Sequence, residues 1–186
     1  MPSNPIPEPW HSFFADIDES LKEQLALHCL GGFVMTILYR LDRPTEDVDV
    51  LPIGATAQTE SLLRLAGEGS VLHKEHKVYL QVVGVVTVPV NYEDRLKEMF
   101  PGTLKRLRLF ALDPYDLALS KLERNTQRDR DDVKHLARTV PLDLNVLQER
   151  YQKELRPDLG SPRREDLTLK LWIEMIEEDH QAAEGK

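Results

Sequence analysis

The 186-residue sequence contains a single cysteine, Cys29, and so cannot form a disulfide within the chain. It also lacks a run of about 20 apolar residues, the length that a membrane span requires. The most apolar stretch, residues 25–38, is interrupted by His28 and two glycines. The first ten residues do not pair a basic segment with an apolar one, so we expect no secretory signal. These absences predict a soluble cytoplasmic protein without a membrane partner.

Two common nucleotide-binding loops are also missing. No Gly-x-Gly-x-x-Gly is present, and GEGS at residues 67–70 lacks the Gly-Lys-Ser/Thr of a P-loop. His73 and His76 have a spacing that metal ligands use, but no cysteine or third clustered ligand accompanies them. This favours surface histidines over a metal site. Cys29 lies in an apolar segment and is interpreted as a small buried side chain.

Positive charge is scarce overall and unevenly distributed. The net charge of −8 argues against a surface that coats nucleic acid, because Lys and Arg dominate phosphate binding. Residues 91–138 nevertheless hold eleven basic and nine acidic residues, a balance of +2 that leaves −10 for the remainder. A basic stretch at 95–138 fits a phosphate-bearing partner such as an RNA acceptor, and it equally fits solvated helix faces. The arginines that we expect to be unpaired and to contact RNA are Arg106, Arg108, Arg124 and Arg128.

The hydrophobic pattern predicts an α+β fold, in which a small mixed β-sheet flanked by helices occupies residues 1–92 and a mostly helical part occupies residues 93–186. Charged residues make up 30% of the chain and hydrophobic residues 41%, which is ordinary globular usage. The predicted strands are 25–30, 48–53 and 107–112, and residues 78–90 are predicted to form either two short strands or one strand bent at Gly84. The predicted helices are 10–24, 33–39, 57–66, 94–100, 113–124, 128–138, 143–155 and 165–179.

Two glycines and two aspartates form the pattern with most chemical meaning. Gly31 and Gly32 close a buried strand and open a helix, where backbone N–H groups and the helix dipole favour an anion. Asp47 and Asp49 lie two residues apart on an extended segment and so project from one face, about 7 Å apart. Such carboxylates bind divalent metal in phosphoryl chemistry. Each motif also has a simpler explanation, since the glycine pair can be only a tight turn and the two aspartates only an exposed strand face.

Residues 30–51, LGGFVMTILYRLDRPTEDVDVL, resemble the nucleotidyltransferase fold superfamily, in which Gly-Gly or Gly-Ser, a short helix and Asp-hydrophobic-Asp on the next strand follow one another. The Arg-x-Thr-x-Asp-x-Asp form of the abortive-infection AbiEii-like and minimal nucleotidyltransferase toxins is matched by Arg43, Thr45, Asp47 and Asp49. Residues 116–136 resemble the second segment of that branch, a helix lysine followed by an Arg-Asp-x-x-Asp-like element. The resemblance covers about 25–136.

The resemblance implies a role for each matching residue. Mg²⁺ would be held by Asp47 and Asp49. The nucleoside triphosphate would be bound by Gly31, Gly32, Arg43 and Thr45. The catalytic set would comprise Asp47, Asp49, Lys121, Asp129 and Asp132, in which Lys121 reaches the triphosphate and Asp129 or Asp132 completes the polar site. Without the resemblance, Lys121 is a lysine on a helix flank and Asp129 a helix N-cap.

The leading hypothesis is a magnesium-dependent nucleotidyltransferase that moves a nucleoside monophosphate from a triphosphate to an acceptor hydroxyl. The resemblance makes an RNA, such as a transfer RNA end, the first acceptor to test, with a protein hydroxyl or a small molecule as the alternatives. It also suggests a toxin that pairs with an antitoxin protein. Polymerase-like members carry a third carboxylate on a later strand, where this sequence offers only Gln81 as a long polar side chain. The alternative is therefore a nucleotide-binding or protein-interaction module that kept the fold and lost turnover.

Overall fold

The computed structural model describes residues 5–52, 54 and 56–184 and confirms the α+β fold that the sequence pattern predicts. The chain divides into two compact units. Unit 1 comprises Met1–Gly84 and Leu96–Ala111, and unit 2 comprises Val85–Arg95 and Leu112–Lys186. No helix among the described residues is long and apolar enough to span a membrane.

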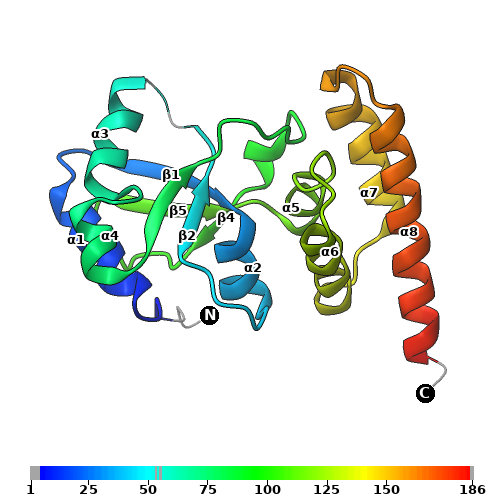
Figure 1. Cartoon of the computed structure of the whole chain (residues 1–186), viewed down its shortest axis with the longest axis horizontal. Helices are drawn as coiled ribbons and strands as arrows, with labels where there is room; N and C mark the ends of the chain where they lie inside the picture. Colours follow the sequence, from blue (N-terminus) through cyan, green and yellow to red (C-terminus); the bar gives the residue numbers. More distant parts are fainter. Residues whose placement is uncertain (1–4, 53, 55, 185–186) are drawn as a thin grey trace. The chain divides into compact units, whose positions relative to one another are not determined.

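Unit 1 is built around a five-stranded mixed sheet with the strand order β3-β2-β1-β5-β4. Strands β1 and β5 are parallel, as are β2 and β3, whereas β1–β2 and β4–β5 are antiparallel. Helices α1, α3 and α4 lie together on one side of the sheet (Figure 1). The elements are α1 (Trp10–Ser20), β1 (Leu25–Leu30), α2 (Gly31–Tyr39), β2 (Asp47–Val50), α3 (Thr56–Ala66), α4 (Val71–His76), β3 (Tyr79–Val82), β4 (Lys97–Met99) and β5 (Leu107–Ala111).

The side chains of the sheet alternate between a buried apolar face and a polar face, as the two-residue period of a strand requires. The apolar face packs against aromatic residues of α1, of which Phe13 and Phe14 are fully buried. Its strand residues include Leu27, Cys29, Val48, Val50, Leu80 and Leu109. The residues between them stay partly or fully exposed; they include Asp47, Asp49, Gln81, His28 and Phe110. The polar face is therefore the face of the sheet that can carry chemistry.

Asp18, in the last turn of α1, joins that helix to the start of β5. Its Oδ1 accepts hydrogen bonds from the backbone N–H groups of Arg106 and Leu107, both at 2.6 Å, and its Oδ2 accepts one from Lys105 at 3.1 Å. The side chain is only 6% exposed. Burial by itself raises the pKa of Asp18, but the three N–H donors favour the charged form, and the net effect is a lowered pKa.

Unit 2 is helical apart from its turns. Its elements are η1 (Tyr92–Arg95), α5 (Pro114–Leu119), α6 (Gln127–Thr139), α7 (Leu144–Arg150), the π-helical turn η2 (Tyr151–Leu155), η3 (Arg156–Asp158) and α8 (Arg163–Glu184). Asp113 caps α5 as predicted, because its side chain accepts from the N–H of Asp116 at 2.9 Å and Pro114 takes the first helical position. Trp172 of α8 and Tyr151 of η2 are fully buried in its core.

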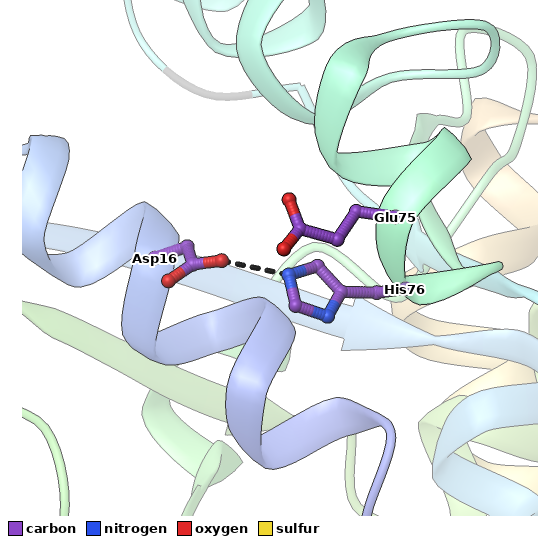
Figure 2. Close-up of side chains that lie close together, drawn as sticks. All are labelled: Asp16, Glu75 and His76. Carbon is purple, nitrogen blue, oxygen red and sulfur yellow. Dashed lines mark hydrogen bonds and ion pairs between the residues drawn. The ribbon is translucent and has the colours of Figure 1, made fainter.

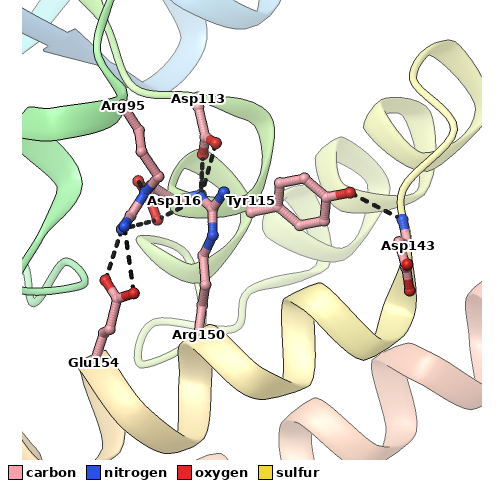
Figure 3. Close-up of polar contacts among 7 residues, drawn as sticks. All are labelled: Arg95, Asp113, Tyr115, Asp116, Asp143, Arg150 and Glu154. Atoms are coloured by element: carbon pink, nitrogen blue, oxygen red, sulfur yellow. Dashed lines mark hydrogen bonds and ion pairs between the residues drawn. The ribbon is translucent and has the colours of Figure 1, made fainter.

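A network of ion pairs holds residues 85–95 in unit 2 (Figure 3). Arg95 donates to both carboxylate oxygens of Asp116, at 2.9 and 3.1 Å, and to Glu154 at 2.7 Å. Arg150 donates to Asp113 at 2.7 Å and to Asp116 at 3.1 Å. Burial raises the pKa of Asp116, and the two guanidinium groups oppose that effect. The network explains why a segment that lies between β3 and β4 in sequence belongs with the helices.

The structure shows that three sequence predictions were wrong in detail. Of the β-structure predicted at 78–90, only Tyr79–Val82 forms a strand, because the chain then continues into unit 2, where the N–H of Val90 bonds to the carbonyl of Glu154. Residues 97–99 form strand β4 against β5 and are not helical. Helix α5 ends at Leu119, so Lys121 lies in the turn that follows and not on the helix. A three-residue strand is too short to show alternation in the sequence.

Replacing Asp18 by Asn should lower the free energy of unfolding by about 1–3 kcal/mol at neutral pH, because three backbone N–H groups lose a charged, buried acceptor. The folded-state pKa of Asp18 is lowered, so this contribution is complete above the unfolded pKa of about 3.9 and is lost as the pH falls through the folded value. Urea denaturation at neutral and acidic pH should show the difference between the two proteins shrinking on acidification.

The matched control is Glu19→Gln, which changes an exposed carboxylate on the same helix. It should leave the unfolding free energy within about 0.5 kcal/mol of the unchanged protein. Equal stabilities of Asp18→Asn and Glu19→Gln would contradict the role assigned to Asp18.

Candidate functional site

Asp49 lies against the first residue of helix α2. The register of β1 and β2 pairs Leu30 with Asp49, which places the next residue, Gly31, beside the carboxylate. A Cβ atom built on Gly31 would lie only 2.0 Å from Oδ2 of Asp49, and Gly31 has a φ of +70°. Only glycine fits there, because the left-handed backbone disfavours any other residue and a side chain would also collide with the carboxylate. The Gly-Gly motif and the aspartate motif are thus brought together.

The start of α2 is an electropositive place with no side-chain cap. Its N-cap residue is Leu30, which makes no capping hydrogen bond. The first N–H groups of a helix have no partner within the helix, and they carry the positive end of the helix dipole. Gly31 and Gly32 form this first turn, half-exposed on the same side as Asp49. Such a terminus suits an anion such as phosphate.

Asp47, the first residue of β2, is oriented by the loop before it. The hydroxyl of Thr45 donates to Oδ1 of Asp47 at 2.7 Å. The same loop is tied to α2, because the hydroxyl of Thr36 donates to the backbone carbonyl of Arg43 at 3.1 Å. The loop that carries Arg43 and Thr45 therefore positions the carboxylate of Asp47 and stays close to the helix that begins at Gly31.

Strand β3 supplies the neighbours of the two aspartates. It pairs Tyr79 with Asp47 and Gln81 with Asp49 in parallel register, so all four side chains share the polar face. The pKa of Tyr79 is raised by burial and by the negative charges of Asp47, Glu68, Asp49 and Glu46. Four carboxylates thus lie near Tyr79, and such a concentration of negative charge around β2 and β3 attracts a divalent cation.

The residue beside Asp49 on β3 is an amide and not a third carboxylate. Gln81 is exposed and stands directly opposite Asp49 in the register. An amide oxygen can accept a hydrogen bond or contact a metal ion, but it does not take a proton at neutral pH. The polar face therefore offers two acids on β2 and a neutral ligand on β3.

Lys121, Asp129 and Asp132 belong to unit 2, where each forms an ion pair. The Lys121 ammonium donates to Oδ2 of Asp132 at 2.9 Å, and both side chains are almost completely buried. Asp129 is buried and accepts two hydrogen bonds from Arg124, at 2.9 and 2.6 Å. Burial raises the pKa of Asp129, but Arg124 and Thr126 together lower it to about 2. The N-cap of α6 is Thr126 and not Asp129, so that prediction was wrong. Asp129 is the third helical residue and forms a capping box with Thr126.

Two of the four arginines that the sequence predicts to be unpaired have carboxylate partners. Arg108 donates to Glu98 on the neighbouring strand through two hydrogen bonds of 3.0 Å, and Arg124 bonds to Asp129, so this expectation was wrong for both. Arg106 and Arg128 are exposed. The partner of Arg108 lies across a strand pair, where spacing along the sequence does not reveal it.

An aromatic group on the polar face was missed by the sequence analysis. The Arg108 guanidinium lies 4.8 Å from the centre of the Phe110 ring. His28, which pairs with Phe110 in the β1–β5 register, meets that ring edge-on at 6.2 Å and 85°. The parallel pairing of β1 with β5 joins residues about 80 positions apart, so no local motif could have shown this group.

Comparison with known proteins gives one match. A family model described as "Nucleotidyltransferase of unknown function (DUF6036)" matches residues 12–179, which is most of the chain. No curated protein and no solved structure matches significantly. The match confirms the resemblance at the level of the nucleotidyltransferase superfamily, whereas the AbiEii-like toxin branch stays a prediction.

A left-handed backbone costs a residue other than glycine about 1–2 kcal/mol. Substituting Gly31 by Ala should lower the free energy of unfolding by more than this, because the new methyl group also collides with Asp49. Gly102→Ala is the matched control, since Gly102 has a φ of +75° and a Cβ atom added there would have no neighbour within 4 Å. Urea denaturation of the two variants separates the contact with the carboxylate from the backbone cost.

The excess cost of Gly31→Ala should largely disappear when Asp49 is also replaced by Ala, because the colliding carboxylate is then gone. If Gly31→Ala and Gly102→Ala destabilise equally, the close approach of Gly31 and Asp49 is not real.

Proposed function

Because this chain belongs to the family described as nucleotidyltransferases of unknown function (DUF6036), we propose that it moves a nucleoside monophosphate from a triphosphate to an acceptor hydroxyl and releases pyrophosphate. The observation that carries the proposal is the contact between the start of α2 and the Asp49 carboxylate. It puts an anion-binding helix terminus beside a pair of acids, which is the pairing that a magnesium triphosphate requires.

The residues present fit a magnesium ion. Asp47 and Asp49 offer carboxylate oxygens from one face of β2, the ligand type that Mg²⁺ prefers, and further acids around Tyr79 add negative charge. Bound there, the ion would neutralise charge on the triphosphate during transfer. Thr45 orients Asp47, and the Gly31 Cα sets the position of Asp49.

In this proposal the triphosphate lies against the first turn of α2. Gly31 and Gly32 leave room for phosphate oxygens to approach the backbone N–H groups, which a side chain at either position would restrict. Arg43 adds positive charge from the loop before β2. In unit 2, Asp132 holds Lys121 and Asp129 holds Arg124, and a role of Lys121, Asp129 and Asp132 toward the triphosphate stays what the resemblance implies.

The transfer itself requires the acceptor oxygen to bond to the α-phosphorus while the bond to the pyrophosphate oxygen breaks. The hydroxyl proton must leave with this step. Gln81 cannot take it, so the proton passes to a carboxylate of the β2 pair or to water. The residues mainly position the reactants and balance charge, which supplies most of the catalysis in phosphoryl transfer.

We propose an RNA hydroxyl as the acceptor. Phe110 and Arg108 lie on the same sheet face as Asp49, two strands away and roughly 10–12 Å across the sheet. Nucleobases of single-stranded RNA stack on aromatic rings and on arginine guanidinium planes. An RNA end that stacks on this group could thus present its terminal hydroxyl at the β2 aspartates. A cytoplasmic toxin that is restrained by an antitoxin protein is the cellular role that the resemblance suggests.

A second candidate function is nucleotide binding without turnover. It is favoured by Gln81, the neutral neighbour of Asp49 on β3. One measurement distinguishes the two candidate functions. After incubation with labelled triphosphates, magnesium and total RNA, the RNA carries covalent label only if transfer occurs.

Asp49→Asn should reduce label transfer at least about 100-fold, because removing a metal ligand costs more than the 10–100-fold loss that follows from changing an outer partner. The thermal midpoint should stay unchanged or rise, since one of two neighbouring like charges is removed. The control is Asp42→Asn, an exposed aspartate in the loop before β2. Loss of folding in Asp49→Asn would instead identify a structural aspartate, and unchanged transfer would reject the proposed site.

RNA binding should depend on Phe110 and Arg108 in different ways. Phe110→Leu should weaken binding by about 1–3 kcal/mol, the value of one base stack, without changing the salt dependence. Arg108→Gln should flatten the slope of log affinity against log salt by about 0.7, the value of one phosphate contact. The control Arg64→Gln removes the same charge from an exposed position on α3. Equal effects of all three substitutions on fluorescence anisotropy would contradict an RNA acceptor on the polar face.

A further inference from the structure

Three metal-binding side chains from helices α1 and α4 meet at one point (Figure 2). They are Asp16 of α1 and Glu75 and His76 of α4, and their ligand atoms all lie within 4.8 Å of one another. Figure 2 shows the two carboxylates and the imidazole pointing toward a shared space between the helices. Of all the described residues, only these form such a group of three.

The imidazole is the fixed member of this cluster. Its side chain is only 11% exposed, and its Nε2 lies 2.7 Å from Oδ2 of Asp16. The ring packs edge-on against Phe13 of α1, with centroids 6.1 Å apart. Glu75 is exposed and so can move to complete a site. A metal ion about 2.0–2.2 Å from each ligand places the ligand atoms within about 4.4 Å of one another, a small contraction from the present spacing.

The cluster is separate from the β2 aspartates. Helices α1 and α4 cover the apolar face of the sheet, whereas Asp47 and Asp49 lie on the polar face. The chemistry also differs, because a mixed set of one imidazole and two carboxylates suits a transition metal such as Zn²⁺ better than Mg²⁺. Failure of the proposed transferase activity would leave this site untouched.

We propose that Asp16, Glu75 and His76 bind a divalent transition metal of the zinc type, with water in the remaining position. Asp16 and His76 already face each other, and the ion would replace the direct contact between them. It would join α1 to α4, two helices that also meet where the Phe13 ring packs against the His76 ring. Its role is to stabilise unit 1, as structural metal sites do.

The test is a titration of the chelator-treated full chain with Co²⁺ and Zn²⁺. One equivalent of Co²⁺ should give the visible absorption of a low-coordinate nitrogen and oxygen site, and Zn²⁺ should displace it and raise the thermal midpoint. His76→Gln should lower the affinity at least about 100-fold. Glu75→Gln, at an exposed position that folding does not require, should lower it about 10-fold or more and serves if the first variant does not fold.

A control isolates the cluster. His11→Gln alters a histidine that contacts a single carboxylate, with Nδ1 3.3 Å from Oε1 of Glu8, and both side chains are at least half exposed. This variant should bind the metal as the unchanged protein does. The proposal is overturned if no metal binds in molar excess, or if Glu75→Gln retains the affinity of the His11→Gln control.

Discussion

The contact between Gly31 and the Asp49 carboxylate is the constraint on which the candidate site depends. Helix α2 can begin directly at the end of β1 only because Gly31 adopts a left-handed backbone, and β2 can pair with β1 in its observed register only because Gly31 has no side chain. Two features of the candidate site follow from this contact. The helix terminus faces a carboxylate, and the register that places Asp49 there also places Asp47 and Gln81 on the same face.

The sheet separates structure from chemistry by its two-residue period. One set of alternate residues is buried against α1, α3 and α4, and the other set forms the polar face with the aspartates, Gln81 and the Arg108–Phe110 pair. A one-residue slip in any strand would exchange the two sets. The Asp18 carboxylate accepts hydrogen bonds from three backbone N–H groups at the start of β5. It thereby fixes the position of the strand that carries Phe110.

Buried charge in unit 2 occurs in pairs and networks. Lys121 is held by Asp132, Asp129 by Arg124, and Asp116 by two arginines. Removing one member of a buried pair leaves an uncompensated charge, which costs several kcal/mol. These residues therefore stabilise unit 2, and variants of them need a stability measurement beside any activity measurement.

Much of the fold and part of the site could be predicted from the sequence, because they depend on local patterns. Apolar spacing located α1, β1 and α8, capping residues located the start of α5, and the Gly-Gly and Asp-x-Asp motifs pointed to β1, α2 and β2. The sequence could not show that Arg108 pairs with Glu98, that Phe110 meets His28, or that His76 gains Asp16 and Glu75 as neighbours. These contacts join residues that are distant in sequence or lie on different elements, and only strand register and helix packing bring them together. The sequence by itself determined which residues could carry chemistry, whereas the tertiary structure decided which of them meet, because side chains interact over a few ångströms of space whatever their separation along the chain.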